Sequence, residues 1–88
     1  MINVEKKSEH KFIVTVEERG TRTQHTVSLD DEYYQRLTRG RITKQELIRD
    51  SFEFLLEREP KQSILSKFNL KIINQYFPEF EEKIEQSE

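Results

Sequence analysis

Few side chains in this sequence have the chemistry of a reaction centre. The chain has two histidines, His10 and His25, and no cysteine. No Asp or Glu stands at a metal-ligand spacing with both histidines, and no Gly-rich phosphate loop or nucleophile–base motif occurs. Glu53, Glu57 and Glu59 follow the pattern of a solvated helix face. The sequence therefore predicts no catalytic residue, no metal site and no cofactor, and we expect a protein that is not an enzyme.

A basic cluster indicates a different chemistry, the binding of phosphate. Residues 33–45 contain no acidic side chain, but they contain four cationic ones. These are Arg36, Arg39, Arg41 and Lys44. A junction between two helices would place them beside free backbone amides, as in many phosphate-binding sites. Alternatively, they are ordinary solvated charges near helix ends, which a chain with 36% charged residues is expected to contain.

The composition predicts a single small domain with a lean core. The chain has 88 residues, of which 33% are hydrophobic, and it includes six Phe and three Tyr. We expect one domain over residues 1–88, with residues 1–8 and 85–88 disordered at its ends. Apolar surface left over on so polar a protein favours a homodimer.

No apolar run approaches the ~20 residues of a membrane span and no signal peptide is evident, so we expect a cytoplasmic protein without a membrane partner.

Residues 10–29 have the pattern of a β-hairpin, because two runs rich in β-branched residues flank Gly20. A turn centred on Arg19 and Gly20 places Phe12 opposite Val27 and Val14 opposite His25. One face is then apolar and consists of Phe12, Val14, Val16, Val27 and Leu29. The other face is polar and includes Thr15, Glu17, Arg22, Gln24, Thr26 and Ser28. Arg-Gly is not a favoured type I′ pair, so a four-residue loop of the same parity is the alternative.

Two helices should follow the hairpin. Asp30 can cap the first helix and Gly40 can end it. Thr43 and Glu46 have the spacing of a capping box, which begins the second helix. Leu47, Ile48, Ser51, Phe52, Leu55 and Leu56 form an apolar stripe along this helix. Phe54 lies outside the stripe.

The remaining residues, up to 84, alternate short helical signals with breaks. Asn69 and Pro78 are suited to helix starts. The aromatic residues of this tail either cover the hairpin and the second helix or form a partner-binding surface; they are Phe68, Tyr76, Phe77 and Phe80. We therefore expect an α+β fold in which an N-terminal antiparallel β-hairpin (10–29) is followed by three or four short helices within residues 30–84, packed on its apolar face.

Residues 24–58 resemble the ribbon-helix-helix DNA-binding proteins. A strand, a short helix and a Gly-containing turn precede "TKQELIRDSFEFLL", in which residues 46–49 match the Glu-Leu-Ile-Arg often found in that family's second helix. The resemblance implies that Gln24, Thr26 and Ser28 meet base edges in the major groove, with Thr43 and Lys44 on a phosphate. The chain differs from the family in offering the ribbon strand an intramolecular partner at residues 12–16.

The tail "ILSKFNLKIINQYFPEFEEKI" resembles that of small prokaryotic proteins that join a β-hairpin to a helical tail, a group that implies no activity. Two functions therefore remain. The first is a small non-enzymatic binding or interaction protein whose partner the sequence does not identify, with no small-molecule substrate inferred. The alternative is a dimeric DNA-binding regulator of the ribbon-helix-helix kind.

Overall fold

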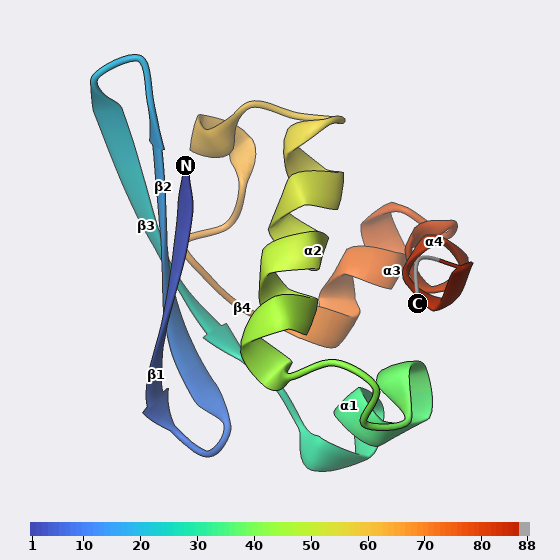
Figure 1. Ribbon diagram of the computed structural model, residues 1–88. Helices are drawn as coiled ribbons and strands as arrows, with labels where there is room; N and C mark the ends of the chain where they lie inside the picture. The colour runs from blue at the N-terminus through green and yellow to red at the C-terminus, as the bar shows by residue number, and fades with distance from the viewer. Residues whose placement is uncertain (87–88) are drawn as a thin grey trace.

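The computed structural model describes residues 1–86 and has an α+β fold (Figure 1). The N-terminal strands are β1 (Ile2–Ser8), β2 (Lys11–Glu18) and β3 (Thr21–Ser28). The helices that follow are α1 (Asp31–Thr38), α2 (Lys44–Leu56), α3 (Ile73–Tyr76) and α4 (Phe80–Gln86). A 3-10 turn, η1 (Lys61–Ser63), a short strand, β4 (Lys67–Asn69), and a second 3-10 turn, η2 (Leu70–Ile72), connect α2 to α3. The predicted order of a hairpin followed by helices is confirmed.

The hairpin of β2 and β3 has the register that its sequence predicts. Phe12 pairs with Val27, and Val14 pairs with His25. The loop has only two central residues, Arg19 with φ 53° and Gly20 with φ 79°. A type I′ turn needs positive φ at both positions, so the hairpin takes the short loop despite the unfavourable arginine, and the four-residue alternative does not occur.

The expectation that residues 1–8 are disordered is wrong, because β1 pairs with β2. Ile2 lies opposite Val16, and Val4 lies opposite Val14. The Met1 ammonium also donates to the carbonyl oxygen of Glu17 at 2.7 Å. Ile2 and Val4 alternate with polar residues and pack against the core, which is the pattern of an edge strand with one apolar face.

The segment 30–84 is not purely helical, because β4 lies within it. β4 runs parallel to β3, with Val27 opposite Phe68, and the Thr26 N–H donates to the carbonyl oxygen of Ser66 at 2.8 Å. The strand order is β1-β2-β3-β4. Parallel pairing requires a crossover of a dozen or more residues, and α1 with α2 supplies it.

The predicted N-cap hydrogen bonds are present at α2 but not at α1. The Thr43 hydroxyl accepts from the Glu46 N–H at 3.0 Å, and the Glu46 carboxylate accepts from the Thr43 N–H at 2.8 Å, which confirms the capping box. Asp30 occupies the N-cap of α1, but its side chain makes no capping bond. Helix α1 ends where Arg39 and Gly40 both take positive φ.

Helix α2 is covered on two sides (Figure 1). On one side it lies against the sheet, where the Phe52 ring is 5.4 Å from the His25 ring. On the other side lie α3 and α4, and the Phe54 ring is 5.2 Å from Phe80 and 5.9 Å from Phe77. Phe54 is only 7% exposed although it falls outside the predicted stripe. The C-terminal helices therefore turn the second face of α2 into core.

The C-terminal end is also more ordered than expected. Glu85 and Gln86 belong to α4, whereas the part of the expectation that concerns residues 87–88 falls outside the described residues. None of the described helices is long and apolar enough to cross a membrane.

We predict that Phe54→Ala lowers the free energy of unfolding by about 3–5 kcal/mol, because it leaves a cavity between α2 and the helices that cover it. The adjacent exposed change Glu53→Ala should alter it by less than about 0.5 kcal/mol. Urea unfolding followed by circular dichroism measures both. Equal effects of the two changes would mean that Phe54 is solvated.

Candidate functional site

The predicted ribbon residues lie on the face of β3 that points away from the core. Gln24 is exposed, and Thr26 and Ser28 are half-buried. β3 has β2 on one edge and β4 on the other. A ribbon made from two copies of β3 would therefore have to displace β4, and the ribbon-helix-helix resemblance stays a prediction.

Two members of the basic cluster are engaged within the chain. The Lys44 ammonium lies 2.5 Å from the Asp31 carboxylate and donates to the Glu9 carbonyl oxygen at 3.0 Å. Its side chain is only 17% exposed. The Arg36 guanidinium lies 3.5 Å from the Glu81 carboxylate and stacks over the Tyr33 ring. Both Lys44 and Arg36 are therefore already paired with carboxylates of the chain, and a phosphate would have to compete with these carboxylates.

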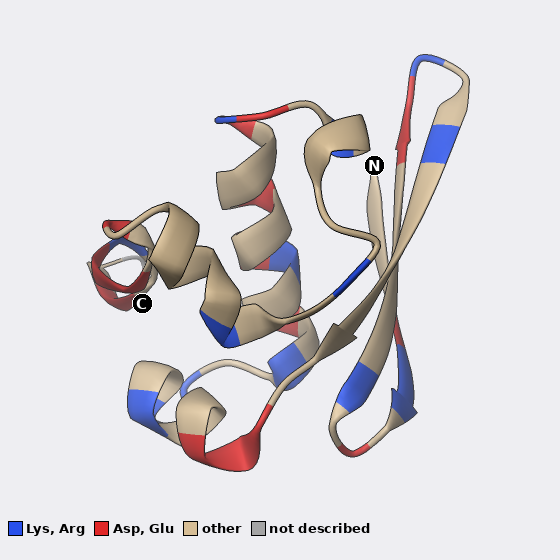
Figure 2. Cartoon of the chain, turned by 180° about the vertical axis from the view of Figure 1, so that it is seen from behind, with Lys and Arg blue, Asp and Glu red and all other residues tan. Residues whose placement is uncertain are grey.

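The remaining members of the basic cluster are Arg39 and Arg41, and Thr43 is the other residue predicted to contact a phosphate. Both arginine side chains are exposed, and no ion pair within residues 1–86 involves them. Thr43 uses its hydroxyl on the Glu46 amide, while the Glu46 carboxylate occupies the Thr43 amide. An incoming phosphate at this helix start would compete with a carboxylate already bound there. Figure 2 shows lysine and arginine spread over the sheet and several helices rather than gathered on one element.

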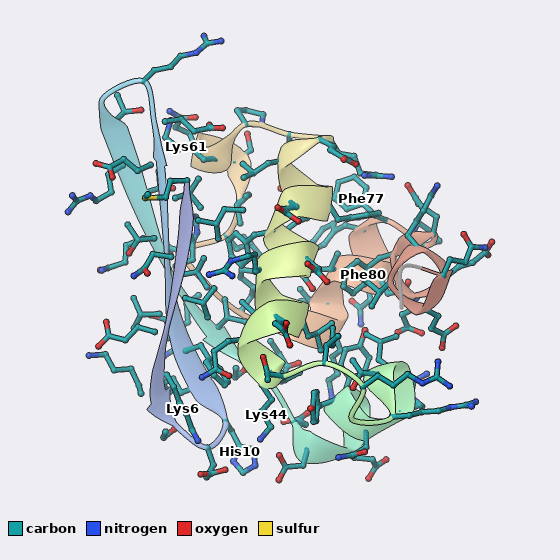
Figure 3. The ribbon with its side chains drawn as sticks, viewed as in Figure 1. Lys6, His10, Lys44, Lys61, Phe77 and Phe80 are labelled. Atoms are coloured by element: carbon teal, nitrogen blue, oxygen red, sulfur yellow. The ribbon has the colours of Figure 1, made fainter. Side chains whose placement is uncertain are left out.

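Both histidines form hydrogen bonds with other groups of the chain. His10 Nε2 lies 3.1 Å from the Asp31 carboxylate, beside Lys44 (Figure 3). His25 is 2% exposed, and its Nδ1 donates to the Leu65 carbonyl oxygen at 2.8 Å. In the neutral ring, Nε2 accepts from the Thr23 hydroxyl at 2.9 Å. Within the described part of the chain, no group of three or more His, Asp or Glu side chains could hold a metal ion.

A mainly apolar hollow lies where α2 ends, between the segment 63–68 and α3. Its volume is about 290 Å³. Its buried lining residues are Leu55, Ile64, Phe68 and Ile73. Its more exposed lining residues are Leu65, Ile72, Tyr76 and Phe77, with Glu59 and Ser63 at polar positions. We call this hollow the apolar cleft.

The walls of the apolar cleft are fixed from outside it. The bonds from His25 to Leu65 and from Thr26 to Ser66 hold one wall against the sheet. The ring contact between Phe54 and Phe77 holds the opposite wall against α2. As a result Leu65, 47% exposed, and Tyr76, 65% exposed, keep their side chains at the surface. The cleft is thus built by the core rather than formed by a loose loop.

A second hollow, between α2 and α4, has a different character. It measures about 410 Å³ and is lined by Asp50, Glu53, Phe54, Glu57, Arg58, Lys83 and Ile84. Partial burial, and then the neighbouring Glu53 and Glu46, raise the pKa of Asp50. Charges of both signs line it, and the Arg58 guanidinium stacks 3.6 Å above the Phe54 ring. We regard this hollow as a solvated seam between two helices.

Comparison with protein-family models, with curated proteins and with solved structures found no match. The sequence left open whether Phe68, Tyr76, Phe77 and Phe80 are core or surface, and of these Phe80 is fully buried. It did not predict the exposure of Leu65, which depends on the pairing of β4 with β3.

We predict that Asp31→Asn lowers stability near neutral pH. The Lys44 ammonium, and then His10, hold the pKa of the Asp31 carboxyl below its ordinary value of 3.8. A depressed carboxyl pKa stabilises the fold above that ordinary value, and this contribution is lost as pH falls through the folded-state pKa. The difference between variant and wild type should therefore shrink at acid pH in urea titrations.

Glu32→Gln is the matched control, since Glu32 shares the first turn of α1 but makes no ion pair among the described residues. A deficit of Asp31→Asn that persists unchanged at the lowest pH would contradict the ion-pair account.

Proposed function

We propose that this chain is a non-enzymatic binding protein that takes an apolar segment of another protein into the apolar cleft. The observation that carries the proposal is the exposure of Leu65 and Tyr76 at a cleft that is also lined by four buried core side chains, Leu55, Ile64, Phe68 and Ile73. Aromatic and aliphatic side chains around a preformed hollow are the usual anchors of a binding surface.

The charge at the cleft indicates the chemistry of the partner. Glu59 is the charged side chain that lines the cleft, and within residues 1–86 its carboxylate makes no hydrogen bond or ion pair. Its backbone is fixed, because the Glu59 N–H donates to the Leu55 carbonyl oxygen at 2.9 Å. A lysine or arginine next to apolar anchors would neutralise this carboxylate. The expected partner is thus a basic amphipathic segment.

The proposal includes a homodimer. The lean hydrophobic composition supports it, and two surfaces are candidates, the edge of the sheet and the helical layer.

The test uses a synthetic amphipathic helical peptide with leucines on one face and lysines beside them, and a second peptide with glutamates in place of the lysines. We expect the lysine peptide to shift the amide resonances of residues around the cleft, and the glutamate peptide to bind more weakly. Tyr76→Ala should weaken binding about tenfold, which corresponds to the ~1.4 kcal/mol of a moderate anchor. Gln75→Ala, on the exposed side of the same helix, should have no effect.

The proposal fails if neither peptide shifts the cleft resonances at millimolar concentration. It also fails if Tyr76→Ala and Gln75→Ala bind equally well.

DNA binding is the second candidate function, and the observation that favours it is the exposure of Arg39 and Arg41, which form no ion pair with any other residue in the range 1–86. It predicts retention on duplex DNA at low salt that falls steeply as salt rises. Arg39→Glu/Arg41→Glu should abolish retention, and the charge-matched Arg19→Glu/Arg49→Glu should keep it. No retention of the wild type at low salt would end this candidate.

A further inference from the structure

We propose that the free edge of β1 pairs antiparallel with β1 of a second copy, with Val4 opposite Val4 of that copy, so that two four-stranded sheets become one. The inference rests on the homodimer proposed above and identifies its surface, and it does not depend on the apolar cleft.

The backbone of β1 offers a row of free hydrogen-bonding groups. Met1 and Glu17 exchange both of their backbone bonds, at 2.7 and 2.9 Å. Pairs that exchange bonds alternate along an antiparallel ladder, so Asn3 and Glu5 also face β2 with their N–H and C=O groups. The groups of Ile2, Val4 and Lys6 therefore point away from the sheet, where the strand order places no neighbour among the described residues.

The side chains on this edge suit a partner strand. Ile2 and Val4 are half-buried at the border of the core, so a second copy would cover apolar surface that the monomer leaves partly exposed. Lysines often protect edge strands from pairing. Here Lys6 is paired with Glu9 at 3.1 Å and Lys7 with Glu5 at 3.3 Å, so both charges are already compensated.

Two-fold symmetry restricts the possible registers, because residues that face each other must lie on the same side of the sheet. A two-fold axis at Glu5 would set two carboxylates opposite each other, and an axis at Lys6 would oppose two ammonium groups. An axis at Asn3 avoids like charges, but within β1, which begins at Ile2, it pairs only residues 2–4 of the two copies.

An axis at Val4 meets every requirement at once. Val4 faces Val4, Lys6 faces Ile2 and Glu5 faces Asn3 of the second copy, and no side chains of like charge are opposed. The residues with outward-facing backbone groups fall opposite one another, so they exchange both bonds at each such pair. The two apolar borders of the sheets then meet at the symmetry axis. The occupant that fits this edge is a second copy of the same strand.

The first test is proline scanning of β1, read by sedimentation equilibrium. Val4→Pro removes an N–H that only the second copy would use, and proline is tolerated on an edge strand whose N–H faces solvent. We expect a folded protein whose dimer dissociation constant rises at least about tenfold. Asn3→Pro removes an N–H that bonds β2, so it should destabilise the monomer fold itself.

The second test uses the absence of native cysteine. Four variants, Asn3→Cys, Val4→Cys, Glu5→Cys and Lys6→Cys, each place a thiol on the axis of one register only. Facing Cα atoms about 5.5 Å apart suit a disulfide, whereas diagonal neighbours at about 7–8 Å do not. Under glutathione disulfide, Val4→Cys should form a covalent dimer fastest.

The outcomes separate the two proposals. A wild type that stays monomeric up to millimolar concentration overturns the pairing and the homodimer together. A dimer that survives in folded Val4→Pro, or that cross-links fastest at another position, overturns the β1 register but leaves the homodimer standing. If Val4→Pro does not fold, the cysteine series alone decides.

Discussion

The rest of the structure depends on one long-range contact, in which residues 65–69, after α1 and α2, come back to the sheet and dock against β3. Two short bonds hold it, from the Thr26 N–H to the Ser66 carbonyl and from His25 Nδ1 to the Leu65 carbonyl, each 2.8 Å long. This docking converts β3 from an edge strand into an interior one. It also directs the following residues across α2, where Phe77 and Phe80 cover Phe54.

The same docking explains how a small, highly charged chain buries side chains on two faces of α2. A sheet and two helices would leave one face of α2 in water, with Phe54 exposed. With α3 and α4 in place, α2 contributes core side chains on both sides, and one continuous cluster of buried residues runs from Val16 in the sheet to Ile84 in α4. The apolar cleft lies between the end of α2 and α3, where the C-terminal segment leaves part of its contact with α2 open to the surface.

The sequence predicted the local parts of this architecture well. The register of Val14 with His25 and the capping box of Thr43 with Glu46 follow from contacts between residues close in the chain. The expectations that failed involve distant partners. β1 has only two apolar residues, Ile2 and Val4, and its order comes from the strand beside it. β4 is three residues long, too short for a periodic signal, and it exists because β3 offers a free edge.

At the candidate site, too, the sequence predicts local features but not those that depend on residues distant in the chain. A run of arginines and lysines is visible in the sequence, but the partners that engage Lys44 and Arg36 are Asp31 and Glu81, which only the fold brings close. The exposure of Leu65 likewise depends on His25, forty positions earlier in the chain. Charge clusters and apolar residues could therefore be listed from the sequence, while their availability to a partner could not.

The central claim is that residues 60–86 are part of one cooperative core rather than an appended tail. Native-state amide hydrogen exchange tests it most directly, since the Thr26 amide is bonded to Ser66 and the Phe52 amide lies within α2. Both should exchange through the same opening, with the free energy of global unfolding. A Thr26 amide that opens at a much lower free energy than Phe52 would show that the segment 65–69 detaches by itself, and would contradict the account.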